Sequence, residues 1–205
     1  MHLLIDNSNT LTKFALDLGG ELSEWRGVIA TSDLSKTSIQ NTLHSQTFER
    51  ITLCSVVPDS TILIKTIFDQ PIHHISHQSK MPITIDYPNP SKIGADRLAN
   101  ASAAILDRQG PAIVIDFGTA VTFDVISKIG SYLGGVIAPG TASLRDYLHQ
   151  KTALLPAIQL EEPNSIIGRS TEEAMQVGAV IGYRGLIREI LSELRRELGG
   201  TPTIC

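Results

Sequence analysis

Cysteine is scarce in this sequence of 205 residues, which contains only two. Cys54 lies in an apolar run and Cys205 is the last residue, so neither belongs to a spaced set of disulfide-forming or zinc-binding cysteines. The N-terminus lacks a basic segment followed by a long apolar stretch, and no apolar run approaches the roughly 18 residues that span a bilayer. We therefore expect an unprocessed, soluble protein of the reducing cytoplasm, with no membrane partner.

Basic clusters and the common nucleotide-binding signatures are missing as well. The 17 Lys and Arg residues are outnumbered by 21 Asp and Glu, and the formal net charge is −4. Nucleic-acid binding needs clustered basic residues, so small molecules are the expected partners. The sequence has neither a Walker A loop nor a G-x-G-x-x-G fingerprint, which leaves P-loop and Rossmann nucleotide binding unsupported. Its 42% of apolar residues suffices for a sizeable core.

The first half of the chain has the pattern of a β-meander followed by alternating helices and strands. The expected elements are strands at 2–6, 11–17 and 25–30, a helix at 33–47, a strand at 49–57 and a helix at 58–69. A proline-rich loop then precedes the amphipathic segment 91–108, which predicts a further helix. This layout is typical of a ribonuclease-H-like α/β unit.

The opening stretch of the sequence recurs in the second half. Residues 113–125, IVIDFGTAVTFDV, repeat LLIDNSNTLTKFAL of residues 3–16 at an offset of 110. The aligned pairs are Asp6 with Asp116, Ser8 with Gly118, Leu11 with Val121, and Thr12 with Thr122. We therefore predict a duplicated chain with domains at 1–110 and 111–205. Two ordinary hairpin turns with solvated aspartates are the alternative.

Two such turns facing each other would suit a nucleotide. Turns of small residues leave backbone N–H groups and hydroxyls available to phosphate oxygens, and a carboxylate at a strand end can hold a cation. The expected fold is therefore α/β, with two ribonuclease-H-like units of the actin-like ATPase type around a central nucleotide cleft.

Six short motifs follow one another along nearly the whole chain. They are Asp6-Asn7-Ser8-Asn9-Thr10 with Lys13, Ser55-Val56-Val57-Pro58, Tyr87 and Pro90 before Gly94-Ala95-Asp96-Arg97, Asp116-Phe117-Gly118-Thr119-Ala120, Gly134-Gly135-Val136-Ile137-Ala138-Pro139-Gly140, and Gly168-Arg169-Ser170-Thr171. In this order they resemble the type III pantothenate kinases, members of the acetate and sugar kinase, Hsp70 and actin superfamily. The resemblance implies ATP-dependent phosphorylation of pantothenate to 4'-phosphopantothenate, the first step of coenzyme A biosynthesis.

The resemblance assigns the ATP phosphates to the two turns. The implied nucleotide-binding residues are Asp6, Asn7, Ser8, Asn9, Thr10, Leu11, Thr12 and Lys13 in the first half and Thr119 in the second. Asp6 would also organise Mg²⁺, and Asp116 would hold a monovalent cation, potassium or ammonium. A solvated strand lysine is the alternative for Lys13.

Asp96 is the implied general base, which would receive the hydroxyl proton of pantothenate. The implied substrate-binding residues are Tyr87, Gly94, Ala95, Asp96, Arg97 and Thr171, the last from the other subunit of a homodimer. Three of them have simpler alternatives: Asp96 favours a helix start, Arg97 pairs with Asp107 or stays solvated, and Tyr87 packs in its loop. Gly94 and Ala95 would leave room for the substrate to approach the backbone.

A long amphipathic helix is expected after Ser170, which opens a capping box with Glu173. Gly178, Gly182 and Gly185 recur along it at helical spacing, either to pack closely within the monomer or to form a subunit contact. The sequence does not decide between the two.

Two features depart from the family pattern. Ser8 stands where the phosphate loop normally has glycine, and serine would be strained if this position had positive φ. The chain also ends where family members continue, so we expect a second unit that is shortened at its C-terminus, with nucleotide affinity affected more than chemistry. The rival functions are a non-catalytic regulatory homologue and a kinase for another small hydroxylated substrate.

Overall fold

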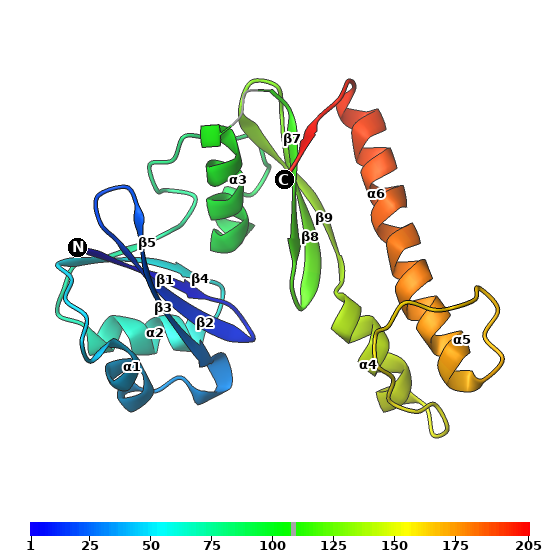
Figure 1. The fold of residues 1–205 in the computed structure, drawn as a ribbon. Coiled ribbons are helices and arrows are strands. Elements are labelled where there is room, and N and C mark those ends of the chain that lie inside the picture. Colours follow the sequence, from blue (N-terminus) through cyan, green and yellow to red (C-terminus); the bar gives the residue numbers. More distant parts are fainter. Residues whose placement is uncertain (108–109) are drawn as a thin grey trace. The chain divides into compact units, whose positions relative to one another are not determined.

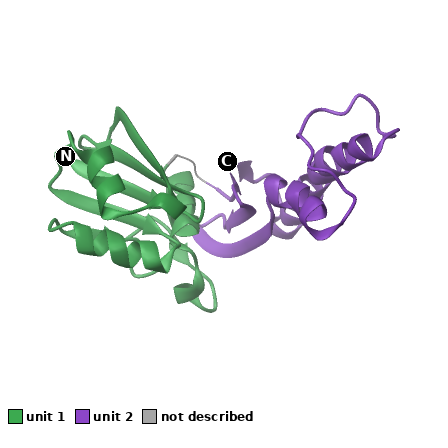
Figure 2. Cartoon of the chain, turned by 90° about the horizontal axis from the view of Figure 1, so that it is seen from below, with its two compact units in different colours: residues 1–107 green, residues 108–205 purple. Residues whose placement is uncertain are grey.

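The computed structural model describes residues 1–107 and 110–205 of the chain. The chain divides into two compact units, Met1–Asp107 and Arg108–Cys205 (Figure 2). The sequence analysis places the boundary at residue 110, and the expected end of the 91–108 helix lies outside the described residues. Each unit has its own sheet and its own core.

The first unit is a mixed sheet with helices packed against it (Figure 1). Its elements are β1 (His2–Asn7), β2 (Leu11–Asp17), β3 (Leu22–Ala30), η1 (Thr31–Asp33), α1 (Lys36–Leu43), β4 (Arg50–Ser55), α2 (Pro58–Ile67), β5 (Ile72–His74), β6 (Thr84–Ile85), η2 (Pro90–Lys92) and α3 (Ala95–Asp107). The strand order is β3-β2-β1-β4-β5, in which β1, β2 and β3 form the predicted antiparallel meander. β4 runs parallel to both β1 and β5, as helical crossovers require.

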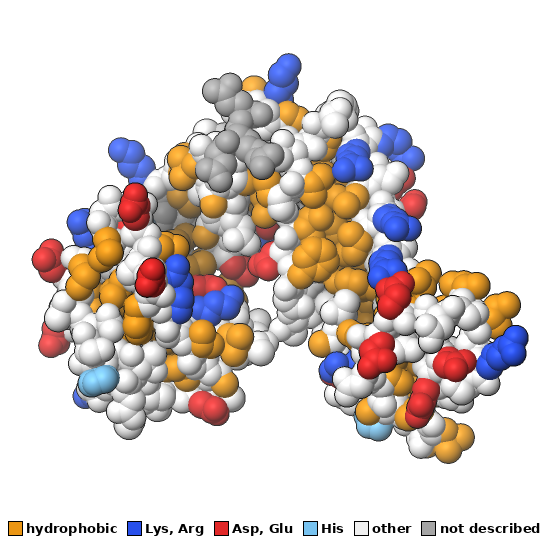
Figure 3. Space-filling model, viewed as in Figure 1, with side chains coloured by type: hydrophobic (Ala, Val, Ile, Leu, Met, Phe, Trp, Pro, Cys, Tyr) orange, Lys and Arg blue, Asp and Glu red, His pale blue; other side chains and the backbone are white. Residues whose placement is uncertain are grey.

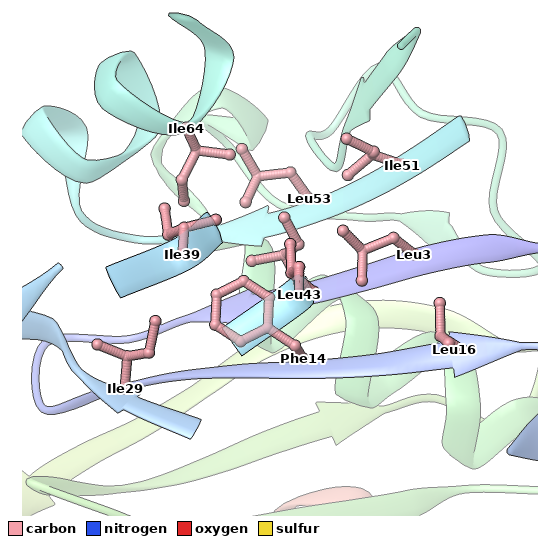
Figure 4. Close-up of a cluster of buried hydrophobic side chains, with 10 residues drawn as sticks. Leu3, Phe14, Leu16, Ile29, Ile39, Leu43, Ile51, Leu53 and Ile64 are labelled. Atoms are coloured by element: carbon pink, nitrogen blue, oxygen red, sulfur yellow. The ribbon is translucent and has the colours of Figure 1, made fainter. Parts of the chain in front are cut away.

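Strand alternation determines what each face of this sheet carries. Every second residue of β1 and β2 is buried, and these side chains meet α1 and α2 on one face (Figure 4). The core consists of Leu3, Ile5, Phe14, Leu16, Ile29, Ile39, Leu43, Ile51, Leu53 and Ile64. The intervening residues, which include Asp6 and Lys13, therefore lie on the opposite face of the sheet.

The second unit also begins with an antiparallel meander. Its elements are β7 (Ala112–Phe117), β8 (Ala120–Ile126), β9 (Ser131–Pro139), α4 (Thr141–Lys151), α5 (Thr171–Val177), η3 (Gly178–Gly182), α6 (Tyr183–Leu198) and β10 (Thr203–Ile204). The strands lie in the order β10-β7-β8-β9. The sequence analysis foresaw neither β9 nor α4, and it expected one continuous helix where α5 and α6 are joined by the π-helical turn η3.

The apolar stripe of α6 packs against the core of the second unit. Ile113, Val121 and Phe123 of the sheet are buried with Tyr183 at the start of α6. Five apolar residues along α6 pack around this cluster but stay partly exposed: Ile187, Ile190, Leu191, Leu194 and Leu198. Figure 3 accordingly shows hydrophobic side chains gathered on the second unit between the strands and α6. In the described part of the chain, no helix is both long and apolar enough to cross a bilayer.

The two units begin with similar hairpins, but the offset between them changes by one residue at the turn. Asp6 pairs with Lys13 across β1 and β2, whereas Asp116 pairs with Thr122 across β7 and β8. The return strands therefore correspond at an offset of 109. Their inward-facing residues are Thr12, Phe14 and Leu16 in β2 and Val121, Phe123 and Val125 in β8. The expected pairs Leu11–Val121 and Thr12–Thr122 are wrong, because the second turn is one residue shorter and a one-residue slip reverses the faces of a strand.

Candidate active site

The first turn, Ser8–Leu11, joins β1 to β2 and is closed by Ser8. The Ser8 backbone N–H and hydroxyl each donate to the Leu11 carbonyl, both at 3.0 Å. No described residue other than glycine has a positive φ, so Ser8 is not strained. The expected conformational penalty at this position is therefore absent. The serine hydroxyl instead supplies a hydrogen bond that glycine lacks.

Two of the implied phosphate ligands have side chains that face the interior. Asn7 is 1% exposed and Thr12 is fully buried. The Asn7 Nδ2 atom donates to Thr12 Oγ1 at 2.7 Å, and Ser55 Oγ donates to Asn7 Oδ1 at 2.6 Å. These side chains support the turn from the buried side of the hairpin, so Asn7 and Thr12 could contact a ligand only through backbone atoms. Asn9 and Thr10, at the tip of the turn, are exposed.

Asp6 and Lys13 lie on the outer face of the same hairpin. Lys13 Nζ is 3.4 Å from Asp6 Oδ2, and the two side chains are 56% and 47% exposed. An exposed pair of this kind adds little to stability. Both groups are therefore accessible to a ligand, with a cation on Lys13 that suits phosphate and a carboxylate on Asp6 that suits a metal ion.

Asp96 occupies the first turn of α3, where helix N–H groups favour negative charge. Its Oδ1 atom accepts a hydrogen bond from the Arg97 backbone N–H at 2.8 Å. A Cβ atom on Gly94 would lie only 2.4 Å from this oxygen. The space left by Gly94 therefore accommodates the Asp96 carboxylate. Ala95 is buried, at 8% exposure, which differs from the expected opening for substrate at Gly94 and Ala95.

Asp6 and Asp96 come together around Cys54. Cys54 is the partner of Asp6 in the parallel β1–β4 pair. Burial, together with the negative charges of Asp6 and Asp96, raises the pKa of the Cys54 thiol to about 12. Geometry agrees, because a Cβ atom on Gly94 would lie 2.4 Å from Asp96 Oδ1 and 3.6 Å from Val56 Cγ1, just after the end of β4. The two carboxylates meet at the carboxyl ends of β1 and β4, the edge where open α/β sheets bind ligands.

The remaining first-unit candidates are Tyr87 and Arg97. Tyr87 follows β6 in the loop before η2 and is 37% exposed. Arg97 follows Asp96 on α3 and is partly buried. The side chain of its alternative partner, Asp107, lies outside the described part of the structure.

The second turn, Gly118–Ala120, places Asp116 and Thr119 at the end of β7, where both are exposed. The Gly118 N–H donates to the Ala120 carbonyl at 2.9 Å and closes the turn. The Gly140 N–H donates to the Thr119 carbonyl at 3.0 Å and ties the turn to the end of β9. Asp116 thus offers an accessible carboxylate beside a turn of fixed backbone.

Thr171 lies elsewhere in the second unit, at the start of α5. Ser170 caps this helix by accepting from the Glu173 N–H at 3.1 Å, while Glu173 Oε2 accepts from the Arg169 N–H at 2.6 Å. In the expected capping box, the Glu173 side chain would accept from the Ser170 N–H. It accepts instead from the N–H of the preceding residue, Arg169. Thr171 lines a largely apolar cavity of about 770 Å³ with residues of α4, η3 and α6. Neither Asp116 nor Thr119 lines it.

The sequence analysis missed one residue that contacts the first turn, Thr31 at the start of η1. Its hydroxyl donates to the Ser8 carbonyl at 2.8 Å, and its N–H donates to the Thr10 carbonyl at 2.9 Å. Thr31 has no recognisable motif around it. The comparison of the two units is the only feature that could have indicated Thr31. Thr31 and Gly140 each directly follow the third strand of a meander.

Comparison with solved structures supports the fold. A candidate 2-dehydro-3-deoxygalactonokinase from Sinorhizobium meliloti superposes with a TM-score of 0.59 at 12% identity, over 100% of this chain and 85% of that one. A candidate transcriptional activator of the Baf family from Campylobacter jejuni superposes with a TM-score of 0.57 at 21% identity, over 92% and 78% of the two chains. The predicted α/β fold class is confirmed.

Comparison of sequences identifies the family. The model of the type III pantothenate kinase family matches residues 2–193. A type III pantothenate kinase of Akkermansia muciniphila is 50% identical over 203 residues, covering 99% of this chain and 84% of the relative. That of Methylacidiphilum infernorum is 43% identical over 197 residues, covering 96% and 72%. The chain therefore belongs to the type III pantothenate kinase family.

Proposed function

We propose that this protein transfers the γ-phosphoryl group of ATP to the terminal hydroxyl of pantothenate and so begins coenzyme A biosynthesis. Membership of the kinase family supports the reaction. The observation that supports particular residues is that Asp6 lies opposite Cys54 near the end of β1, while Gly94 brings Asp96 close to Val56, just after β4. In this proposal, Asp6 is the carboxylate that binds a metal ion and Asp96 is the base, both beside the same edge of the sheet.

The first turn and Lys13 bind the phosphates in this proposal. Phosphoryl transfer has a loose transition state with negative charge on the equatorial oxygens, so most of the catalysis is positioning and electrostatic stabilisation. Lys13 Nζ, which is exposed beside Asp6, supplies positive charge to those oxygens. Asp6 would hold Mg²⁺, which neutralises phosphate charge when bound.

Asp96 acts as the general base. Its carboxylate is oriented by the Arg97 N–H and by the space at Gly94. It takes the proton of the pantothenate hydroxyl as that oxygen attacks the γ-phosphorus. The Arg97 guanidinium and Tyr87 contact the rest of pantothenate, since a forked donor suits its carboxylate.

Asp116 and Thr119 are the proposed nucleotide-binding residues of the second unit. Thr119 contacts phosphate from the exposed second turn, and Asp116 holds a potassium or ammonium ion. A single exposed carboxylate next to backbone carbonyls suits a weakly hydrated monovalent ion better than a hard divalent one.

The proposed reaction is tested by measuring ADP release with ATP, Mg²⁺ and pantothenate, in potassium and in sodium buffer. We expect turnover that needs pantothenate and Mg²⁺ and that falls when sodium replaces potassium. ADP release that no pantothenate concentration stimulates would contradict the proposal and favour the regulatory homologue. Release stimulated only by another hydroxylated compound would favour the alternative kinase.

We also propose a homodimer in which Thr171 reaches the partner's pantothenate. In this chain a Cβ atom at Gly178, Gly182 or Gly185 would meet no atom within 4 Å. Close packing among the described residues of the monomer therefore does not account for these glycines. Gly178 and Gly182 line the same apolar cavity as Thr171, which favours a partner helix against this face.

Replacing Gly182 by alanine distinguishes a subunit contact from an ordinary helix position within the monomer. In an isolated helix, Gly182→Ala would stabilise the fold by about 0.5–1 kcal/mol. At a close subunit contact the added methyl group instead weakens association, so we expect a higher dimer dissociation constant by sedimentation or light scattering. Ser192→Ala, at an exposed position of α6, serves as the matched control with unchanged association. An unaltered dissociation constant in Gly182→Ala would place the dimer contact elsewhere.

A further inference from the structure

We propose that Thr31 is a positioning residue that orients the first turn, Ser8–Leu11, for binding the phosphates of ATP. Thr31 lies outside every motif of the family resemblance, and its role here rests on the proposed function of that turn. It makes two hydrogen bonds to the turn. Its hydroxyl donates to the Ser8 carbonyl at 2.8 Å and its backbone N–H donates to the Thr10 carbonyl at 2.9 Å.

The two hydrogen bonds from Thr31 also determine where the N–H groups of the turn point. A trans peptide is planar, and its C=O and N–H groups point in opposite directions. Because the Ser8 carbonyl points toward Thr31, the N–H of Asn9 points away from it. Because the Thr10 carbonyl also points toward Thr31, the N–H of Leu11 is directed away as well, and it donates to Ser8 Oγ at 3.5 Å within the turn. Thr31 therefore determines which side of the turn presents N–H groups, the donors that bind phosphate in such turns.

The Thr31 hydroxyl is itself held by a directed chain of hydrogen bonds. A hydroxyl has one proton, and that of Thr31 goes to the Ser8 carbonyl, so at the 3.1 Å contact with Thr12 Oγ1 the threonine at position 12 must donate. Thr12 Oγ1 in turn accepts from Asn7 Nδ2, and Asn7 Oδ1 accepts from Ser55 Oγ. Asn7, Thr12 and Ser55 are all buried. The chain of hydrogen bonds links the end of β4 to the turn.

The second unit repeats this contact at the equivalent position. The Gly140 N–H donates to the Thr119 carbonyl, as the Thr31 N–H does to that of Thr10. Both pairs are related by the offset of 109 that relates the return strands. Residue 140 has no hydroxyl, but Ser143 Oγ donates to the same Thr119 carbonyl at 2.9 Å. The residue after the third strand thus contacts the turn in both units. The side-chain donor is Thr31 itself in the first unit and Ser143 in the second.

The test compares Thr31→Val, which keeps the shape and removes the hydroxyl, with Thr31→Ser, which keeps the hydroxyl. Loss of one oriented hydrogen bond is expected to raise the KM for ATP roughly tenfold in Thr31→Val, with the KM for pantothenate unchanged, while Thr31→Ser stays near wild type. Thr52→Val is the matched control, since it removes a partly buried hydroxyl that bonds His2 in the same unit. We expect it to leave both KM values unchanged.

Direct binding of Mg-ATP by calorimetry, without pantothenate, separates this inference from the proposed reaction. If wild type binds ATP but does not phosphorylate pantothenate, a roughly tenfold weaker Kd in Thr31→Val still supports the role of Thr31. Wild-type ATP affinity in Thr31→Val overturns it, and so does failure of the wild type to bind ATP. Should Thr31→Val not fold, Thr31→Ser decides: wild-type affinity supports the hydroxyl role, and a tenfold loss contradicts it.

Discussion

Replacing Asp96 by asparagine is expected to lower kcat for pantothenate phosphorylation by roughly 10²- to 10⁴-fold, the usual contribution of a general base. The carboxamide oxygen of Asn can still accept the Arg97 N–H bond, and it occupies the same space beside Gly94. The substitution therefore removes the proton acceptor with little change in shape. Because the ATP-binding groups are untouched, the KM for ATP should stay near the wild-type value. Steady-state kinetics measure both constants.

Asp59→Asn is the matched control for this experiment. Asp59 also lies in the first turn of a helix, α2, and is exposed. It shares the favourable position of Asp96 relative to a helix N-terminus but has no place in the proposed site. We expect wild-type kcat in Asp59→Asn. A kcat within a few-fold of wild type in Asp96→Asn would instead return Asp96 to the simpler role of a helix-start residue.

The parts of the fold that follow from local patterns were predictable. The β1–β2–β3 meander and α2, with Pro58 as its first residue, lie where alternation and turn residues indicate. The β9 strand was missed because Gly134 and Gly135 interrupt its pattern, and both have positive φ in the structure. Glycines of this kind weaken a strand signal while serving a bend or bulge.

The candidate site was predictable at the level of motifs but less so at the level of side-chain direction. Asp6 and Lys13 are accessible and Asp96 begins a helix, as a ligand-binding role requires, whereas Asn7 and Thr12 face the core side of the sheet. A polar residue in a turn motif gives no sign of which face it will take. That depends on the register of β1 with β2 and on the packing of α1 and α2. Thr31 was missed because its contacts join residues 23 positions apart.

Gly140→Ala is expected to destabilise the second unit by about 1–3 kcal/mol, the usual cost of forcing a methyl group into filled space. An added Cβ atom would lie 2.2 Å from the Gly118 carbonyl oxygen and 2.7 Å from that of Thr119. These are backbone atoms, so relief requires moving the turn itself. Gly140 has φ −70° and ψ 166°, a conformation open to any residue. The requirement for glycine is therefore one of space alone.

The displaced turn should also bind ATP less well, because its Thr119 carbonyl is tied to the Gly140 N–H that would have to move. Thermal or denaturant unfolding measures the loss of stability, and calorimetry with Mg-ATP measures the loss of affinity. Gly118→Ala is the matched control: its Cβ would approach nothing closer than the Ala120 carbonyl oxygen at 3.4 Å, in the same turn. We expect it to unfold at nearly the wild-type midpoint. If Gly140→Ala matches wild type in both measurements, the second turn can move away from the end of β9 without cost, and its backbone is not the fixed phosphate-binding element proposed for this kinase.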